Sequence, residues 1–281
     1  RPRLRQVPQP GAPAAARLWL GWAALTTDDA ELAQGFHRRN LPLLRQHGPP
    51  SLLGWTLFEL GAISRDAGDY EEARSYLEEA RATCEKIGYH FALLSCLQGL
   101  GQTAELVGQV GQAQSYYRQA VALRNYLGDV TDIATSLALL TRVTLALGDE
   151  PQAERTLQEL RAFAERADDA IAWGCYEYAA AEVACSRGQL EAAGAGFQQS
   201  VASLRPTRRR GLAILGLQRL GQLYIRTGDY AQAEATFQEA LQEAWARGSL
   251  AQTLAAIAGL GAVCARQANA ERAAELAAVA P

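Results

Sequence analysis

Residues 220–240 read LGQLYIRTGDYAQAEATFQEA. They predict one helix that ends at Gly228 and a second that begins after Asp229, because glycine closes a helix in the left-handed conformation and aspartate caps the next one. The Gly-Asp-Tyr step also stands at 68–70, and partial copies begin at Gly108, Gly148 and Gly188. The step therefore recurs with a period of about 40 residues, and a fixed period of this size predicts a repeat protein.

Three columns of residues follow the same period. The alanine column contains Ala33, Ala73, Ala113, Ala153, Ala193, Ala233 and Ala273. The small-residue column contains Gly21, Gly61, Gly101, Thr141, Ala181, Gly221 and Gly261. A bulky column follows one helical turn after the alanines and contains Leu77, Tyr117, Leu157, Phe197 and Phe237. One helix pair cannot bury such a face alone, so we predict an all-α solenoid of about seven stacked helix-turn-helix units.

The period also sets the predicted boundaries. Residues 1–12 are rich in proline and arginine, and we interpret them as a linker or tail. A single solenoid is predicted over 13–281, with repeats at about 13–48, 49–88, 89–128, 129–168, 169–208, 209–248 and 249–281. The first helices are expected at 14–25, 51–66, 91–106, 131–146, 171–186, 211–226 and 251–266. The second helices are expected at 70–87, 109–127, 150–166, 189–204, 230–247 and 270–279.

Three of the second helices carry capping signals. The expected N-caps are Asp69, Asp149 and Asp229. A glutamate or glutamine stands three residues after each of them, at Glu72, Gln152 and Gln232, which is the spacing of a capping box.

Composition excludes several functions. The formal net charge is −3, which gives no reason to expect binding to nucleic acid or to an anionic membrane. No stretch approaches the roughly 20 apolar residues that span a bilayer. The five cysteines have no zinc spacing, and we expect reduced, buried thiols in a cytoplasmic protein. The sequence contains no methionine, so we expect a piece of a longer chain.

Catalytic signals are missing from the sequence. It has no glycine-rich phosphate loop, no nucleophile elbow and no paired catalytic constellation. The three histidines, at 37, 47 and 90, show no metal-ligand spacing. We therefore expect no enzymatic activity, no cofactor and no metal. The arginine run at 208–210 could hold an anion, but such a run is more often a solvated loop.

The best-formed repeat carries a family resemblance. Gly221 is followed by Tyr224, Ala233, Phe237 and Ala240. This spacing resembles the tetratricopeptide repeat family, which implies a right-handed solenoid that binds proteins or peptides. The unit departs from the family in its length, about 40 residues against about 34. It also lacks the usual proline after the second helix.

A second resemblance concerns the larger context. The segment 254–276 is similar to the last repeat of tetratricopeptide sensor regions in large bacterial regulators, such as the maltose-regulon activator and related signal-transduction ATPases of the STAND type. The resemblance implies that the chain is the sensor or interaction arm of a larger bacterial cytoplasmic regulator.

The family resemblance also implies a binding face. In tetratricopeptide repeats the first helix lines a concave groove, at positions three and six before and one and four after the small residue; we call these the groove columns. They predict a peptide- or protein-binding face at Trp55, Phe58, Gln98, Gln102, Arg142, Tyr178, Glu182, Gln218 and Gln222. Side-chain amides can pair with the backbone of an extended peptide, and Arg142 and Glu182 would add charge selectivity. The alternative is a surface that only contacts water.

Two further functions stay open. A small-molecule sensor would have its pocket near Trp173 and Tyr178. A self-association module would use the alanine-rich last repeat as a homo-oligomer contact, at Ala255, Ala258 and Ala262.

Overall fold

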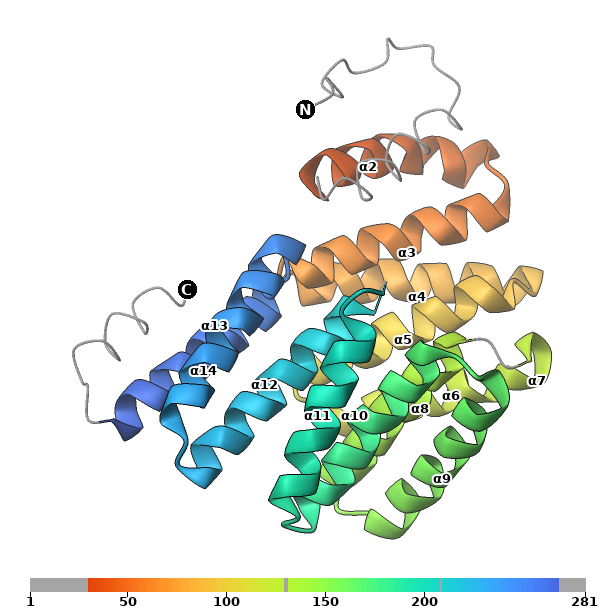
Figure 1. The fold of residues 1–281 in the computed structure, drawn as a ribbon. Helices are drawn as coiled ribbons and strands as arrows, with labels where there is room; N and C mark the ends of the chain where they lie inside the picture. Colours follow the sequence, from red (N-terminus) through yellow and green to blue (C-terminus); the bar gives the residue numbers. More distant parts are fainter. Residues whose placement is uncertain (1–29, 129–130, 208, 268–281) are drawn as a thin grey trace. The chain divides into compact units, whose positions relative to one another are not determined.

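The computed structural model describes residues 30–128, 131–207 and 209–267. Within these ranges the chain forms helices and no strand, which confirms the predicted all-α class (Figure 1). The helices predicted at 14–25 and 270–279 lie outside the described residues, as does the linker predicted at 1–12. The small-residue position Gly21 and the alanine-column position Ala273 also fall outside.

The chain divides into two compact units, residues 1–100 and 101–281. Each unit is described by itself, and the single solenoid with its repeat boundaries stays a prediction. The described helices of the first unit are α2 (Ala30–His47), α3 (Pro50–Asp66), α4 (Tyr70–Ile87) and the part of α5 (His90–Leu106) that precedes the division after Leu100.

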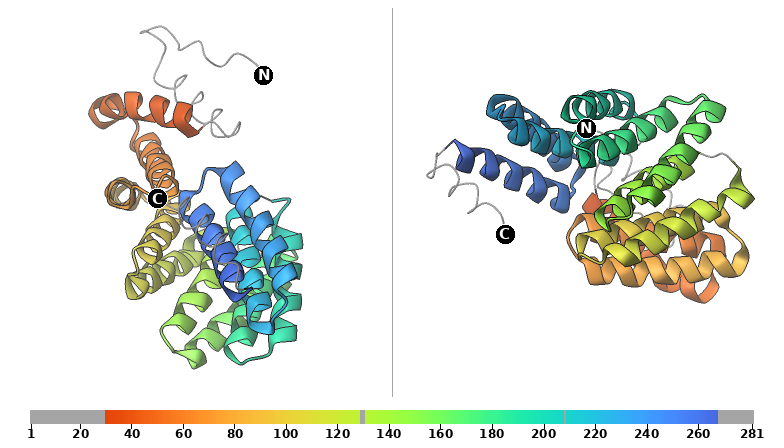
Figure 2. Two further views of the ribbon diagram at one scale, coloured as in Figure 1. Left: turned by 90° about the vertical axis from the view of Figure 1, so that its left-hand side faces the viewer. Right: turned by 90° about the horizontal axis from the view of Figure 1, so that it is seen from below.

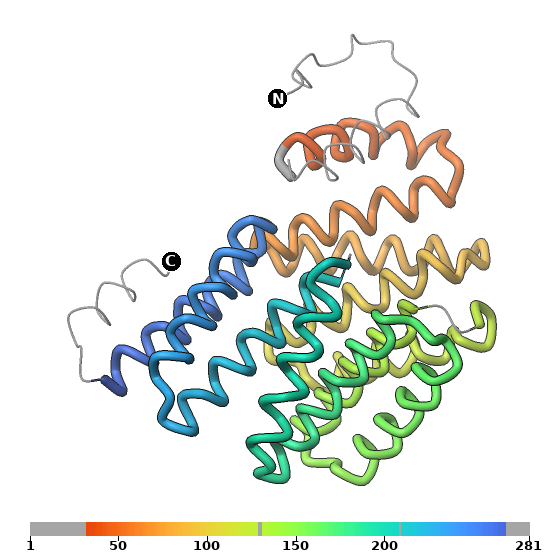
Figure 3. The backbone as a smooth tube through the Cα atoms, in the orientation of Figure 1, coloured from red at the N-terminus to blue at the C-terminus, as the bar shows by residue number. Residues whose placement is uncertain are grey.

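The second unit begins with the rest of α5 and continues as antiparallel helix pairs (Figures 2 and 3). In each pair a tight turn joins the two helices, so that consecutive helices run in opposite directions. The helices are α6 (Val110–Ala122), α7 (Arg124–Leu127), α8 (Thr131–Ala146), α9 (Glu150–Ala167), α10 (Ala170–Ser186), α11 (Leu190–Leu204), α12 (Arg210–Thr227), α13 (Tyr230–Arg247) and α14 (Leu250–Arg266).

The glycine turn and the aspartate caps form as predicted at Asp149 and Asp229. Gly228 ends α12 with a φ of 83°, and the backbone N–H of Asp229 donates to the carbonyl of Tyr224. The side chains of Asp149 and Asp229 then accept hydrogen bonds from the backbone N–H of Gln152 and Gln232, at 3.1 and 3.2 Å. These bonds satisfy N–H groups that the first turn of a helix leaves unpaired.

One predicted cap does not form. Asp69 precedes α4, but its side chain makes no capping hydrogen bond. The capping box predicted with Glu72 is therefore wrong. The carboxylate of Glu72 instead accepts hydrogen bonds from Ser64 and Arg38 at 2.7 and 2.8 Å, so it is drawn away from the helix terminus. At the other two turns only the aspartate bond of the predicted box forms, because the N–H groups of Asp149 and Asp229 donate to carbonyls of the preceding helix and not to Gln152 or Gln232.

The glycines of the small-residue column pack against the residues of the bulky column. A Cβ atom on Gly221 would lie 2.7 Å from the ring of Phe237, and one on Gly61 would lie 2.6 Å from Leu77. The glycines therefore let the two helices of a repeat approach closely. The described members of the alanine column, from Ala33 to Ala233, are fully buried.

The second helix of the third repeat differs from the prediction. We expected one helix over 109–127, but the structure breaks it at Leu123, between α6 and α7. The N–H of Leu123 bonds to the carbonyl of Ala120, three residues back, so the last turn tightens. Beyond the break, the side chain of Arg124 donates to Glu159 at 2.9 Å.

Candidate functional site

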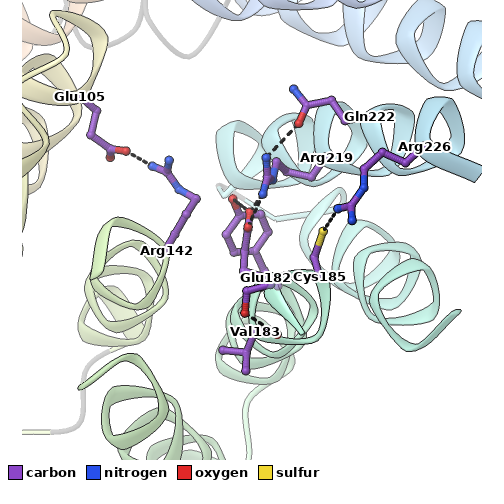
Figure 4. Close-up of polar contacts among 10 residues, drawn as sticks. Glu105, Arg142, Glu182, Val183, Cys185, Arg219, Gln222 and Arg226 are labelled. Atoms are coloured by element: carbon purple, nitrogen blue, oxygen red, sulfur yellow. Dashed lines mark hydrogen bonds and ion pairs between the residues drawn. The ribbon is translucent and has the colours of Figure 1, made fainter. Parts of the chain in front are cut away.

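The first helices of the second unit carry two neighbouring groups of bonded polar side chains. They come from α5, α8, α10 and α12, with one tyrosine from α6 (Figure 4). We call the two groups together the polar network. It comprises Glu105, Tyr117, Arg142, Tyr178, Glu182, Arg219 and Gln222.

One half of the network is centred on Glu105. Its carboxylate accepts a hydrogen bond from the hydroxyl of Tyr117 at 2.6 Å and forms an ion pair with Arg142. The Nε atom of Arg142 is buried and has no hydrogen-bond partner. Burial alone would lower the pKa of Arg142, but the electrostatic influence of Tyr178, Glu105, Tyr117 and Glu182 outweighs it and raises the pKa. Arg142 therefore stays charged among its partners.

The other half is centred on Glu182, of which 3% is exposed. Its carboxylate accepts hydrogen bonds from Nε and NH2 of Arg219 at 2.8 and 2.6 Å. The hydroxyl of Tyr178 donates to it at 2.8 Å. Burial and the charge of Glu182 raise the pKa of Tyr178 well above its ordinary value, so the phenol remains a donor. Charge-assisted hydrogen bonds of this kind are strong, and they satisfy the buried carboxylate.

The two ion pairs share one geometric relation. Glu105 and Arg142 are 37 residues apart, and so are Glu182 and Arg219. The period is about 40 residues, so a spacing of 37 is about one helical turn short of it. Each glutamate therefore pairs with an arginine on the next first helix, one turn before the position that is equivalent to its own. The pairs therefore connect consecutive repeats.

At one end of this surface, the exposed Arg226 donates from NH1 to the sulfur of Cys185 at 3.1 Å. Gln222, one turn before it, is also exposed and accepts a hydrogen bond from Arg219 at 2.9 Å. A thiol does not neutralise a guanidinium ion. This end of the surface therefore offers a positive charge and an amide to a partner.

The predicted groove-column residues differ in their burial and in their hydrogen-bond partners. Arg142, Tyr178 and Glu182 meet in the polar network. Gln218 is buried and donates to the backbone carbonyl of Gln252 at 2.8 Å, so it holds α12 to α14. Gln98 is also buried, in the first unit, whereas Gln102 in the second unit is partly exposed.

The predicted aromatic residues Trp55 and Phe58 lie in the first unit. Their rings are 5.3 Å apart, and the ring of Trp55 stacks at 6.5 Å on that of Phe91. Phe91 is exposed and the other two rings are partly buried.

The small-molecule pocket predicted near Trp173 and Tyr178 stays a prediction, but the structure shows what the two rings contact. The ring of Trp173 contacts Tyr176, whereas that of Tyr178 contacts Phe197. Since Tyr178 is fully buried and bonded to Glu182, its hydroxyl is already used within the chain.

Sequence reasoning missed Arg219, Arg226 and Tyr117. None of the three stands in a groove column, so the groove positions of the tetratricopeptide repeat family do not include them. A signal was nevertheless present, because Glu105 and Glu182 are each followed by an arginine 37 residues later on the next first helix. A search for opposite charges one turn short of the period would have found both pairs.

The outer side of α14 carries the residues predicted for self-association. Ala255, Ala258 and Ala262 are exposed, and a Cβ atom on Gly261 would meet nothing within 4 Å. On the preceding helix, Trp245 is 75% exposed. The described end of the second unit therefore exposes several apolar side chains.

Other candidates gain little from the structure. In the arginine run at 208–210, Arg209 forms an ion pair with Asp132. In the part of the chain that the structure describes, no group of three or more His, Cys, Asp or Glu side chains could hold a metal ion. Among the helices of residues 30–128, 131–207 and 209–267, none is both long and apolar enough to cross a membrane.

Comparison with known protein families finds one repeat in two parts of the chain. Models of the tetratricopeptide repeat match residues 50–125 and 214–244. These two stretches therefore match the tetratricopeptide repeat, which confirms the resemblance that the columns indicated. A comparison with curated protein sequences finds no match.

Solved structures share the fold at low identity. Aspartyl phosphate phosphatase F from Bacillus subtilis superposes with a TM-score of 0.68 and 16% identity, over 86% of this chain and 61% of the other. The Rap conjugation gene regulator of the plasmid pLS20, solved in complex with a Phr peptide, gives 0.64 and 18%, over 86% and 65%. A STAND protein with a tetratricopeptide repeat sensor from Pyrococcus horikoshii gives 0.53 and 16%, over 88% and 39%. This chain thus matches less than two thirds of the length of each of these three proteins.

Proposed function

We propose that the chain is a non-enzymatic scaffold that binds a protein or peptide on the first-helix surface of its second unit. The observation that carries the proposal is the exposed surface at the end of the polar network, where Arg226 and Gln222 present a charge and an amide beside the partly buried Glu182–Arg219 pair. Rigid supports below exposed polar groups favour binding, because less side-chain entropy is lost when a partner docks.

The proposed surface is narrower than the groove columns suggest. Several of the predicted binding residues are bonded within the chain, so Arg142 and Glu182 would act mainly by holding neighbouring repeats together. The contacts with a partner would come mainly from the exposed Gln222 and Arg226.

We also propose that the chain is the sensor or interaction arm of a larger bacterial cytoplasmic regulator. The support for this context is the sequence resemblance of the last repeat, together with the STAND and Rap structures of the same fold.

Peptide binding is tested with a displayed library of random peptides selected on the whole chain. The double variant Gln222→Ala/Arg226→Ala is expected to weaken binding of a selected peptide at least tenfold, which corresponds to about 1.4 kcal/mol. The control variant is Gln238→Ala, which removes an exposed amide from α13. Equal affinity of both variants and the unmodified chain would mean that the peptide binds elsewhere.

Self-association is a second candidate, favoured by the exposed alanines and Trp245. Size-exclusion chromatography with light scattering is expected to give a dimer that Ala258→Glu converts to a monomer, because an isolated charge inside an apolar contact is costly. Ala235→Glu, at an exposed alanine of α13, serves as the control. A monomer in all three samples would exclude this function for the chain.

A further inference from the structure

The first described helix departs from the columns of the repeat. At the bulky position, which elsewhere holds Leu77 or Phe237, α2 carries His37, and three residues later it carries Asn40 in place of a small residue such as Ala80. Both side chains are buried, with 2% and 0% exposed. Neither ring nitrogen of His37 and neither amide atom of Asn40 has a hydrogen-bond partner.

The following helix carries a matching pair. Thr56 of α3 is fully buried, and its hydroxyl also has no partner. Glu59 follows one turn later, at the position that holds Gly99 and Gly259 in later repeats. Desolvation raises the pKa of Glu59 to about 7, and burial lowers the pKa of His37 to about 4. Both directions are those of groups that burial deprives of water without giving them a charged partner.

The bulky column shows where His37 lies relative to Glu59. Leu77 lies against Gly99, and Phe237 lies against Gly259 in a later repeat. The same step along the sequence leads from His37 to Glu59. The register therefore places the imidazole and the carboxylate at one contact between α2 and α3.

A second column relates Asn40 to Thr56 in the same way. Ala240 and Ala256 share one core cluster, and an equal step along the sequence leads from Asn40 to Thr56. By this register, the contact between α2 and α3 brings four polar side chains to positions that hold mainly apolar or small residues in other repeats.

Polar residues in these columns of later repeats are satisfied. Ser200, in the column of Asn40, donates to the carbonyl of Gly174 at 2.8 Å, and Ser136, in the column of Thr56, donates to that of Asp132 at 3.3 Å. Buried polar groups without partners weaken packing, because they lose hydration and gain nothing in return. The α2–α3 contact is thus weaker than its counterparts in the second unit.

Ion pairs at the surface join α2 to α4. Arg38 donates from NH2 to both carboxylate oxygens of Glu72 at 2.8 Å, and Arg45 donates from Nε and NH2 to Glu79 at 2.9 and 2.5 Å. All four side chains are more than a third exposed. Exposed pairs of this kind are screened by salt. In addition, Pro42 lies inside α2, where it removes a backbone hydrogen bond and weakens the helix itself.

We propose that α2 is a releasable helix, which detaches by local unfolding while the helix pair α3–α4 stays folded. Its core contact contains unpaired polar groups, and its attachment to α4 depends on two exposed ion pairs. Salt should therefore control its release. A released α2 would uncover the face of α3 around Thr56, which is now buried.

Hydrogen–deuterium exchange of the whole chain tests this proposal. From about 0.05 M to about 1 M NaCl, amide exchange in α2 is expected to accelerate about tenfold, with less than about a twofold change in α4, because the ion pairs of α2 are screened. Equal exchange rates in α2 and α4 at both salt concentrations would overturn the proposal. This comparison needs no variant.

Variants separate the effect of the unpaired polar groups in the α2–α3 contact from that of the ion pairs between α2 and α4. His37→Leu/Asn40→Ala introduces the residues of the next repeat and is expected to slow exchange in α2 about tenfold at high salt. Glu79→Gln is expected to raise exchange in α2 at low salt toward the high-salt rate. Glu71→Gln, which breaks only the Arg74–Glu71 pair within α4, is the control and should leave α2 unchanged. Acceleration by both glutamine variants alike, or no slowing by the double variant, would contradict the proposed attachment.

Discussion

Replacing Arg219 with methionine is expected to lower the free energy of unfolding of the second unit by about 3 kcal/mol. The reason is the environment of its partner, since Glu182 is 3% exposed and would keep a buried negative charge with only the hydroxyl of Tyr178 as a direct donor. The effect stays at the lower end of the usual range because the Arg219 side chain is itself 35% exposed. Urea unfolding followed by far-UV circular dichroism measures the loss.

A matched pair of variants isolates the buried charge. Arg161→Met breaks an ion pair with Glu165 on α9 whose side chains are 63% and 53% exposed. We expect this control to change the free energy of unfolding by less than about 0.5 kcal/mol. Adding Glu182→Gln to Arg219→Met should recover part of the stability, because the uncompensated charge is removed. If Arg219→Met and Arg161→Met lowered the free energy of unfolding by similar amounts, the Arg219–Glu182 pair would contribute no more to stability than an exposed ion pair.

Phe237→Ala is expected to lower the free energy of unfolding by about 3–5 kcal/mol, the range for removing a buried aromatic ring. The ring is 1% exposed and lies between two glycines of neighbouring repeats, Gly221 and Gly259. It also belongs to a core cluster with Leu260 and Val263. Its loss therefore opens a cavity at the contact between two repeats, which thermal or urea unfolding detects as a lower midpoint.

The glycine column gives a direct check of this geometry. Gly221→Ala should destabilise the unmodified chain, because the new Cβ atom would lie 2.7 Å from the ring of Phe237, but it should be tolerated in the Phe237→Ala background. Gly261 stands in the same column, and a Cβ atom there would meet nothing within 4 Å. Gly261→Ala should therefore stabilise α14 by up to about 1 kcal/mol. Destabilisation by Gly261→Ala equal to that by Gly221→Ala would contradict the interlocking columns.

The fold could be predicted from the sequence because several local signals agree with the period. The left-handed glycines at the turns, the aspartate caps at 149 and 229 and the glycine–bulky contacts each depend on residues within one repeat. The break at Leu123 could not be predicted, since no glycine or proline marks it. The buried polar residues His37 and Asn40 of α2 were not predicted, because the columns were defined by the residues that most repeats share.

The site was predictable only in part, for a physical reason. The groove columns predict which residues lie on one side of a helix. They do not predict whether such a side chain is already hydrogen-bonded to a neighbouring residue. Gln218 stands in a groove column and bonds to the backbone of α14, whereas Arg226 stands outside the columns and is exposed. Contacts between repeats determine whether a side chain is free to bind a partner. A column pattern contains no information about these contacts.

The charge pairs between repeats also restrict how this protein can change its length. Solenoids gain and lose whole units in the course of evolution when each new junction fits. If residues 169–208 were deleted as one unit, Arg219 would take the place one turn from Arg142 on the next first helix. Two guanidinium ions would then face each other, where the charge of Glu182 now acts on both. Loss of the fifth repeat would therefore replace an attraction between neighbouring repeats with a repulsion.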